Sequence, residues 1–456
     1  MRTIKEYHLS NPTEFKEKLL FWSDQFDEVV WMDSNNYPQK TSNFDQILAV
    51  QAFTAIKTEA HGAFDRLREY QETTRDWIFG YLSYDLKNDV ENLTSNNFDG
   101  LEFPDLYFFQ PAKIFLIKGD KLELHYLKMV DDEMDGDFEE IYRYEIGDFR
   151  GEKIDDREER IENREEIKEN RKEKIESRPK EGTINARISR ESYLQKVNKL
   201  LGYIQRGDIY EANFCQEFYA ENLEIDPIPV FEKLNEISSS PFAAFLKLEN
   251  NYLLSASPER YLKKEGLKII SQPIKGTARR EVDKVEDAKI AEALSKDSKE
   301  VSENVMIVDL VRNDLSKIAK RGSVKVEELC KVYSFKQVHQ MISTISAELN
   351  LQIAPVEVLR ATFPMGSMTG APKISAMKII EELEETKRGL YSGAIGYFTP
   401  DGDFDFNVVI RSILYSSKNK YVSFSVGGAI TSKSIPELEY EECLLKAKAM
   451  RDSLNR

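Results

Sequence analysis

The order of its strand and helix patterns is the feature that most constrains the fold of this chain. From about residue 186 onward, strand-like segments follow one another in adjacent pairs instead of alternating singly with helices. Regular alternation is typical of parallel α/β sheets, whereas strands that follow each other directly tend to pair antiparallel. No internal repeat of fixed period is visible. The pattern therefore predicts an α+β fold with mainly antiparallel sheets.

Residues 1–150 form a first region of mixed helical and strand character. Asn11 and Pro12 can cap and start an amphipathic helix over residues 13–26. Strand patterns with polar turns between them follow in the same region. They lie at residues 28–33, 77–85 and 113–127, the last of which is predicted to be a hairpin.

A charged connector, residues 151–185, separates this region from the rest of the chain. Between residues 151 and 182 nearly every side chain is charged, and four isoleucines recur about every two helical turns. This pattern fits a solvated helical connector docked through a thin isoleucine stripe. A disordered segment and a partner-binding coiled coil fit it as well, and these alternatives stay open.

Residues 186–456 form the second region, in which ordered patterns return. Ser189 can cap a helix that runs through residues 193–206 and stops at Gly207. Residues 208–220 then alternate between apolar and polar side chains as a strand does.

Composition excludes several classes of partner. The 456 residues are 41% hydrophobic, so the chain can bury a large core, and their formal net charge of −16 argues against a nucleic-acid backbone or an anionic membrane as partner. A small anionic substrate would therefore need a local cation. No signal-peptide core and no run of about 18 apolar residues is visible, so we expect a cytoplasmic protein. The three scattered cysteines are expected to be reduced thiols.

Glutamates near the C-terminus suggest a metal site. Pro436 can open a helix, which places Glu439 and Glu442 three residues apart on one face. Glu303 begins an otherwise apolar run and could supply a third oxygen ligand. Oxygen ligands without a histidine or cysteine cluster point to Mg²⁺ rather than zinc. Taken alone, the same glutamates could also be solvated helix positions.

Several motifs of the second region together resemble the chorismate-utilising enzymes, a family that includes anthranilate, isochorismate and aminodeoxychorismate synthases. The resemblance runs from about residue 186 to the C-terminus, and residues 1–150 resemble the amino-terminal region of the family less specifically. It implies two orthogonally packed, mainly antiparallel sheets between helical layers. The motifs, in family order, are SASPERY, PIKGT, ENVMIVDLVRND, FPMGSMTGAPK, GLYSGAIGY, FNVVIR and the segment from GGAI to EYEE.

Within this family, Lys275 of PIKGT carries the most specific information. Anthranilate synthases resemble PIAGT at this position, whereas PIKGT is typical of members that place an amino group at carbon 4 of chorismate. The resemblance implies that Lys275 attacks ring carbon 2 while the 4-hydroxyl leaves, and that ammonia then adds at carbon 4 and expels the lysine. An amine must lose its proton before it attacks, and we expect an apolar setting near a metal to lower its pKa. The product, 4-amino-4-deoxychorismate, leads to para-aminobenzoate and folate.

The resemblance also implies roles for other side chains. Glu259 matches the general acid that protonates the departing hydroxyl. Glu303 and Glu442 match the Mg²⁺ ligands, with Glu439 as a further ligand or as support through water. The expected substrate-binding residues are Ser367, Gln340, Tyr391, Arg411 and the backbone at Gly427 and Gly428.

Three positions depart from the family pattern. Gln340 stands where many members have a histidine, while His339, one residue earlier, is expected to be structural. Glu211 stands where many members have glutamine or lysine, which argues against a hydrolytic or isomerising reaction because an acid does not simply replace the lysine that activates water there. Ala429 replaces a third glycine.

None of the three cysteines has the sequence context of a glutaminase nucleophile. The resemblance therefore implies a separate glutamine amidotransferase subunit as ammonia source, with free ammonium as a substitute in vitro. Two alternatives remain: an anthranilate synthase component I, which would differ chiefly at position 275, and a catalytically inactive homologue that binds chorismate.

Overall fold

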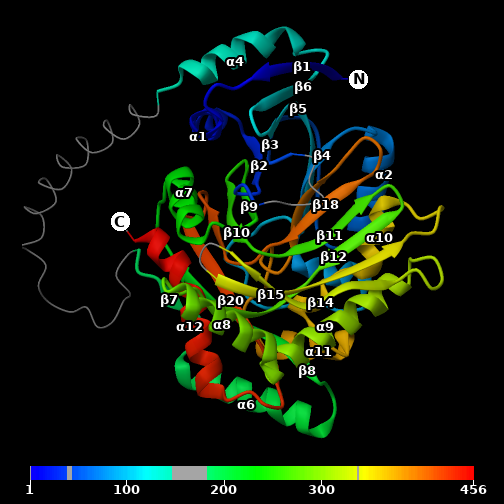
Figure 1. Cartoon of the computed structure of the whole chain (residues 1–456), viewed down its shortest axis with the longest axis vertical. Helices are drawn as coiled ribbons and strands as arrows, with labels where there is room; N and C mark the ends of the chain where they lie inside the picture. The colour runs from blue at the N-terminus through cyan, green and yellow to red at the C-terminus, as the bar shows by residue number, and fades with distance from the viewer. Residues whose placement is uncertain (1, 38–43, 146–181, 336–337, 456) are drawn as a thin grey trace, which may run out of the picture.

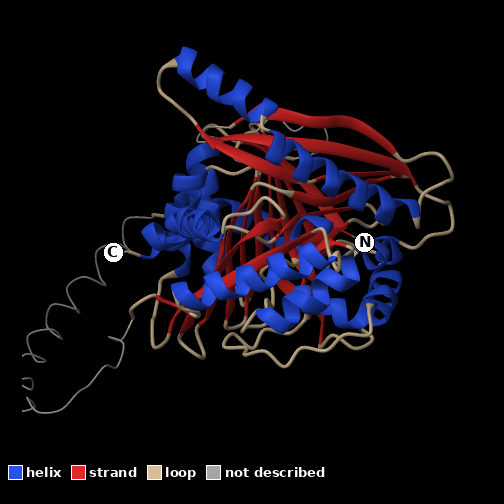
Figure 2. Ribbon diagram, turned by 90° about the horizontal axis from the view of Figure 1, so that it is seen from below, coloured by secondary structure: helices blue, strands red, loops and turns tan. Residues whose placement is uncertain are grey.

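The computed structural model describes residues 2–37, 44–145, 182–335 and 338–455, and within these ranges it confirms the α+β class (Figure 1). All pairings between its named strands are antiparallel. Figure 2 shows the strands in the interior of the molecule and helices on its outside. The predicted connector lies outside the described residues, apart from residues 182–185.

A first series of paired strands crosses the whole molecule and combines both regions of the sequence. In order of pairing, it consists of β16 (Gly370–Ala371), β8 (Glu211–Ala220), β20 (Tyr421–Thr431), β19 (Ser412–Ser416), β10 (Asn251–Ser257), β9 (Phe242–Leu248), β2 (Glu28–Asp33), β3 (Gln46–Thr58), β5 (Leu106–Lys118), β6 (Lys121–Leu127) and β1 (Arg2–His8). The short β7 (Asn185–Ala186) pairs with β8.

A second series branches from β5 and includes the strand on which the PIKGT motif lies. It runs through β4 (Ile78–Leu82), β17 (Ala394–Phe398), β18 (Phe404–Val408), β11 (Arg260–Glu265), β12 (Lys268–Gln272) and β15 (Val338–Glu348), which also pairs with β13 (Ile274–Arg279) and β14 (Lys325–Ser334).

The two long strands β3 and β5 link both series, because the part of β5 that pairs with β4 also pairs with residues 55–58 of β3. Their pairing is interrupted between Ala52 and Thr54, next to Gln51, whose φ of 62° is left-handed. Bulges of this kind bend strands from one sheet into another, and such strands form the corners of orthogonally packed sheets. This architecture matches the predicted arrangement of two sheets.

Helices cover the sheets, and several begin or end at the predicted residues. The Asn11 side chain caps α1, and Ser189 and the left-handed Gly207 bound α6, as predicted. The helices are α1 (Pro12–Trp22), α2 (Ala63–Thr74), α3 (Lys87–Val90), α4 (Met134–Arg143), α6 (Arg190–Arg206), α7 (Pro227–Ser238), α8 (Lys284–Lys296), α9 (Ser298–Ser316), α10 (Pro355–Thr362), α11 (Lys373–Leu383) and α12 (Pro436–Leu454).

Two apolar cores lie on opposite faces of the first series of strands. Successive strand residues point to opposite faces, so Val29 belongs to one core and its neighbour Val30 to the other. The core at Val29 includes residues of α1, α6, α7 and α12, and the core at Val30 joins both sheets with residues of α2, α9 and α10. The sheets are therefore sandwiched between helical layers.

Strands from before and after the connector are neighbours in both series. β2 pairs with β9, and β4 pairs with β17. The domain boundaries at residues 150 and 185 stay a prediction. A boundary at either place would divide the sequence, but the strands on its two sides belong to the same sheets. Within the described residues, no helix is long and apolar enough to span a membrane.

Candidate active site

Lys275 lies on a bulge of β13, which explains why its motif places an amine where the backbone turns. Ile274 is opposite Ile342 of β15 and Thr277 is opposite Gln340, so Lys275 and Gly276 together face a single partner residue. Gly276 adopts a left-handed φ of 89°, which glycine tolerates without strain. Because bulges redirect side chains, this irregularity turns Lys275 away from regular alternation along the strand.

The side chain of Lys275 points into a cluster of carboxylates. Its Nζ lies 3.1 Å from Oε1 of Glu211, and the two side chains are only 12% and 1% exposed. Burial by itself lowers the pKa of Lys275, but the negative charges of Glu211, Glu303 and Glu259 outweigh it, and the pKa is raised. Glu211, which the sequence did not pair with Lys275, thus opposes the lowering of the pKa that is expected from an apolar setting near a metal.

Glu259 lies in the turn between β10 and β11 and is buried. Burial raises its pKa to about 7, although the Ser367 hydroxyl, the Lys275 charge and the Ile274 N–H oppose this shift. A carboxyl group that keeps its proton close to neutral pH suits the predicted role as a general acid. Ser367, in the short 3-10 helix Gly366–Met368, is thereby placed beside Glu259.

Arg411 and Tyr391 come from neighbouring turns. The N–H of Ser392 donates to the carbonyl of Val409, which holds the two turns together. Burial lowers the pKa of Arg411, and no acidic side chain within the described ranges forms an ion pair with its guanidinium. Tyr391 is buried, and its hydroxyl lies 3.6 Å from Sγ of Cys215. A desolvated guanidinium without a counter-charge is suited to bind a carboxylate.

Gly427 and Gly428 of β20 face different surroundings. A Cβ on Gly427 would lie 2.4 Å from Sγ of Cys215, so only glycine fits against β8 at this point. A Cβ on Gly428 would lie 3.4 Å from Oε2 of Glu439, so Gly428 faces the carboxylates of α12. The pair therefore brings the backbone of β20 close to the predicted metal ligands.

Gln340 and His339 are adjacent in β15 but have different partners. Neither amide atom of Gln340 has a hydrogen-bond partner within the described part of the chain, although both atoms are buried. The His339 ring lies 3.0 Å from Asp287 through Nε2 and 2.9 Å from Ser334 through Nδ1. The contacts of His339 agree with its predicted structural role, and the unpaired amide of Gln340 is suited to contact a ligand.

The predicted metal ligands converge on Lys299. Its Nζ lies 3.1 Å from Oε1 of Glu439 and 3.9 Å from Oε1 of Glu303, an oxygen that is buried and accepts no hydrogen bond from any described residue. Glu442 is 46% exposed and pairs with Lys446 at 2.7 Å, so it faces solvent more than Glu439 does. Partial burial favours the neutral acid, but Lys446 and Lys299 hold the pKa of Glu442 below its usual value.

These carboxylates fit Mg²⁺ by their chemistry. The ligands are hard oxygens, one of them an orphaned buried atom, and the Lys299 ammonium marks the place where they stabilise positive charge. Within the described ranges, no three metal-binding side chains already converge to a complete site. Because Lys299 pairs with Oε1 of Glu439, direct binding of Mg²⁺ to that oxygen would displace the ammonium.

Sequence reasoning missed the basic partners in this cluster and one further acid. Lys299 with Glu303 and Glu442 with Lys446 have the i,i+4 spacing that brings helical side chains together, so the sequence held a signal for both. Glu300 also reaches the site, since its Oε2 would lie 3.1 Å from a Cβ on Gly276. The pairing of Glu211 with Lys275 joins distant segments and has no local signal.

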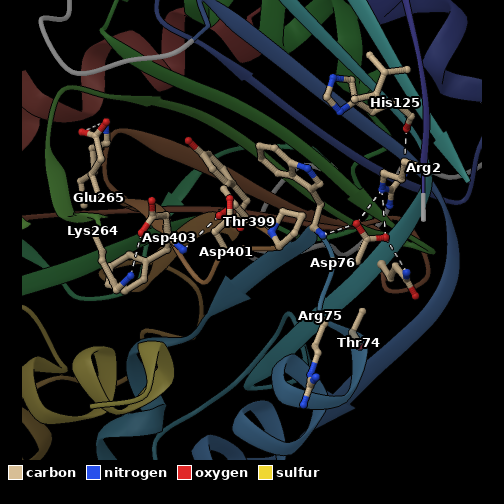
Figure 3. A pocket seen from close by; sticks show the side chains of 17 residues that line it. Arg2, Thr74, Arg75, Asp76, His125, Lys264, Glu265, Thr399, Asp401 and Asp403 are labelled. Carbon is tan, nitrogen blue, oxygen red and sulfur yellow. Dashed lines mark hydrogen bonds and ion pairs between the residues drawn. The ribbon is translucent and has the colours of Figure 1, made fainter. Parts of the chain in front are cut away.

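A cavity of about 580 Å³ lies away from these residues, and its lining includes none of the predicted site residues (Figure 3). Arg2 pairs there with Asp76 at 2.9 Å, and Lys264 pairs with Asp403 at 2.8 Å. The cavity is separate from the cluster around Lys275, because none of its lining residues belongs to that cluster.

Comparison with known proteins shows the family of this chain. The sequence profile described as chorismate binding enzyme matches residues 20–452. Aminodeoxychorismate synthase component 1 from Escherichia coli is 41% identical over 269 residues, which are 59% of this chain and 59% of that protein. Anthranilate synthase component 1 from Thermus thermophilus is 34% identical over 82% of this chain and 76% of its own length.

The fold is also similar to that of a solved anthranilate synthase component I. The crystal structure of anthranilate synthase component I from Streptococcus pneumoniae superposes with a TM-score of 0.71 and 25% identity, covering 91% of this chain and 93% of that one. The chain belongs to the chorismate binding enzyme family.

Proposed function

We propose that this chain is an aminodeoxychorismate synthase component I, which converts chorismate and ammonia to 4-amino-4-deoxychorismate. The observation that carries the proposal is the buried Lys275 amine on the β13 bulge, at the position where anthranilate synthases resemble PIAGT. The similarity to the Escherichia coli aminodeoxychorismate synthase component 1 supports it. Because the match covers only 59% of that relative, the activity rests on this site and not on the relative's name.

In the proposed reaction, Lys275 and Glu259 act on opposite ends of one electron shift. The neutral amine of Lys275 bonds to ring carbon 2, both conjugated ring double bonds shift by one position, and the 4-hydroxyl leaves with the proton of Glu259 as water. Ammonia then bonds to carbon 4, both double bonds shift back, and the lysine nitrogen leaves carbon 2 with its electron pair. Glu259 suits this role because its pKa of about 7 keeps a proton available near neutral pH.

The remaining residues hold the two carboxylates of chorismate. Glu303 and Glu442, supported by Glu439, would hold Mg²⁺, which offsets the charge of the ring carboxylate when it is bound. Arg411 and Tyr391 would bind the enolpyruvyl carboxylate. The other proposed contacts are Ser367, Gln340 and the backbone at Gly427 and Gly428.

We further propose that a glutamine amidotransferase subunit supplies the ammonia in the cytoplasm, as a heterodimer with this chain. The designation of relatives as component 1 supports a partner subunit. The product would serve para-aminobenzoate and folate synthesis.

One product assay tests the proposal. The chain is incubated with chorismate, Mg²⁺ and ammonium at mildly alkaline pH, and products are identified by mass and retention time. We expect aminodeoxychorismate. Anthranilate as the main product would favour the alternative that the Thermus thermophilus relative represents, and unchanged chorismate would indicate an inactive homologue.

A further inference from the structure

Glu211 is the carboxylate in closest described contact with the proposed nucleophile. Its Oε1 lies 3.1 Å from Nζ of Lys275, and its side chain is 1% exposed. Its second oxygen, Oε2, is buried and has no hydrogen-bond partner within the described residues. A buried carboxylate with one free oxygen is costly unless it interacts with a charge or gains a proton.

The backbone holds Glu211 rigidly in this place. As the first residue of β8, it pairs with Thr431 of β20 on one side and with Ala371 of β16 on the other. Gly370 packs so closely that a Cβ there would lie 2.2 Å from the Glu211 carbonyl oxygen. The carboxylate therefore faces Lys275 from a fixed strand and not from a mobile loop.

Three other carboxylates face Lys275, and each has another task in the proposed reaction. Glu259, in the turn before β11, must keep its own proton for the departing hydroxyl. Glu303 of α9 and Glu442 of α12 are the proposed metal ligands. Among the carboxylates that the structure describes, Glu211 alone combines a direct contact with Lys275 and no other assigned role.

We infer that Glu211 is a catalytic residue that accepts the proton of the Lys275 ammonium. The inference rests on the proposed function, because only a nucleophilic lysine must lose a proton. The Nζ–H bond breaks, a bond from the proton to a Glu211 oxygen forms, and the electron pair stays on nitrogen for attack on ring carbon 2. When ammonia expels the lysine nitrogen from carbon 2, Glu211 returns the proton, so the pair is reset after each turnover.

A role for Glu211 as a mere counter-ion and a role as proton acceptor predict opposite effects of Glu211→Gln on the rate of attack. The Glu211 charge raises the pKa of Lys275, so its removal by Glu211→Gln would increase the neutral fraction of a passive lysine. If Glu211 only neutralises charge, the variant should therefore attack chorismate at least as fast as the wild type. If Glu211 takes the proton, the variant should be slower.

The test measures the rate at which the Lys275 adduct forms. Chorismate and Mg²⁺ are mixed with enzyme in the absence of ammonia at pH 7.5, the reaction is quenched rapidly, and the peptide containing Lys275 is quantified by mass spectrometry. We expect Glu211→Gln to slow adduct formation about 100-fold, the size typical of losing a general base. Relative to the wild type at the same pH, the loss should become smaller as pH is raised, since hydroxide can then remove the proton. Glu211→Asp, which keeps a carboxylate, should be less impaired than Glu211→Gln.

Glu217→Gln is the matched control, because Glu217 is a buried acid of the same strand that pairs with Arg187 and not with the site. It should form the adduct at the wild-type rate. A folded Glu211→Gln that forms the adduct as fast as the wild type would overturn the inference and leave the proposed function intact. Absence of both adduct and aminodeoxychorismate in the wild type would contradict the proposed function and this inference with it.

Discussion

Four glutamates of the site differ in their surroundings, and these differences support the different roles proposed for them. Burial raises the pKa values of Glu259 and Glu303 to about 7, whereas nearby lysines hold the pKa of Glu442 below its usual value. Glu211 instead pairs directly with Lys275. Acid, proton acceptor and metal ligand can therefore be the same amino acid within one cluster.

The raised pKa of Glu259 predicts how the chemical step depends on pH. Glu259 acts as an acid only while protonated, and with a pKa of about 7 it loses its proton as pH rises through neutrality. The rate of adduct formation should therefore decline above about pH 7. Glu259→Gln should lower this rate about 100-fold or more and remove the decline, as rapid-quench measurements across pH would show. A decline that persists unchanged in the variant would assign it to another group.

Arg411 is expected to strengthen the binding of chorismate and to lower the stability of the fold. A buried guanidinium without an acidic partner costs free energy, so Arg411→Gln should increase the free energy of unfolding by about 1 kcal/mol while raising the KM for chorismate about 10- to 100-fold. Denaturant unfolding and steady-state kinetics measure the two effects. The control is Arg260→Gln, which breaks a buried pair with Asp405 and should destabilise the protein by about 3 kcal/mol. A similar loss of stability in both variants would disprove the contrast.

For individual helices and strands, the sequence predicted those features that depend on residues close together in the chain. The caps at Asn11 and Ser189 were predictable because a capping side chain binds the backbone only a few residues away. The same holds for the glutamates of α12. The bulge of β13 was not predictable, since it arises from the register with β15, more than 60 residues later in the chain. Tertiary pairing, and not local preference, therefore places the amine.

The convergence of α9 and α12 predicts that activity requires Mg²⁺. Glu303→Gln and Glu442→Gln should each reduce activity severely by removing a ligand charge, and Glu439→Gln should be milder if that residue acts through water. Titration of Mg²⁺ into the chelated enzyme measures the requirement and the shift in affinity for each variant. Full turnover in excess EDTA would refute the requirement, and equal losses in all three variants would refute the ranking.

At the scale of the whole molecule, the two sequence regions complete each other's sheets. β2 of the first region pairs with β9 of the second, and β4 pairs with β17, which begins three residues after Tyr391. The sequence predicted the antiparallel class from the order of its strands. It could not predict these pairings, because strands that are far apart in the chain and pair only in the folded protein leave no periodic signal in the sequence.

This shared architecture predicts the behaviour of a cut chain. If a protease site is introduced between residues 151 and 181, the two fragments should remain associated after cleavage and retain activity, because their strands stay paired. Size-exclusion chromatography and the product assay check this outcome. The second fragment expressed alone should aggregate, since β9 and β17 would then be exposed edges. A soluble, active second fragment would contradict the prediction.

Replacement of Lys275 by arginine, compared with the wild type, tests whether the Lys275 amine is the nucleophile. A guanidinium keeps the positive charge but stays protonated, so it cannot act as the nucleophile. We expect a covalent chorismate adduct on the Lys275 peptide of the wild type, and neither adduct nor appreciable aminodeoxychorismate from Lys275→Arg, while chorismate binding changes only modestly. Substantial aminodeoxychorismate from Lys275→Arg, together with no adduct in the wild type, would contradict it.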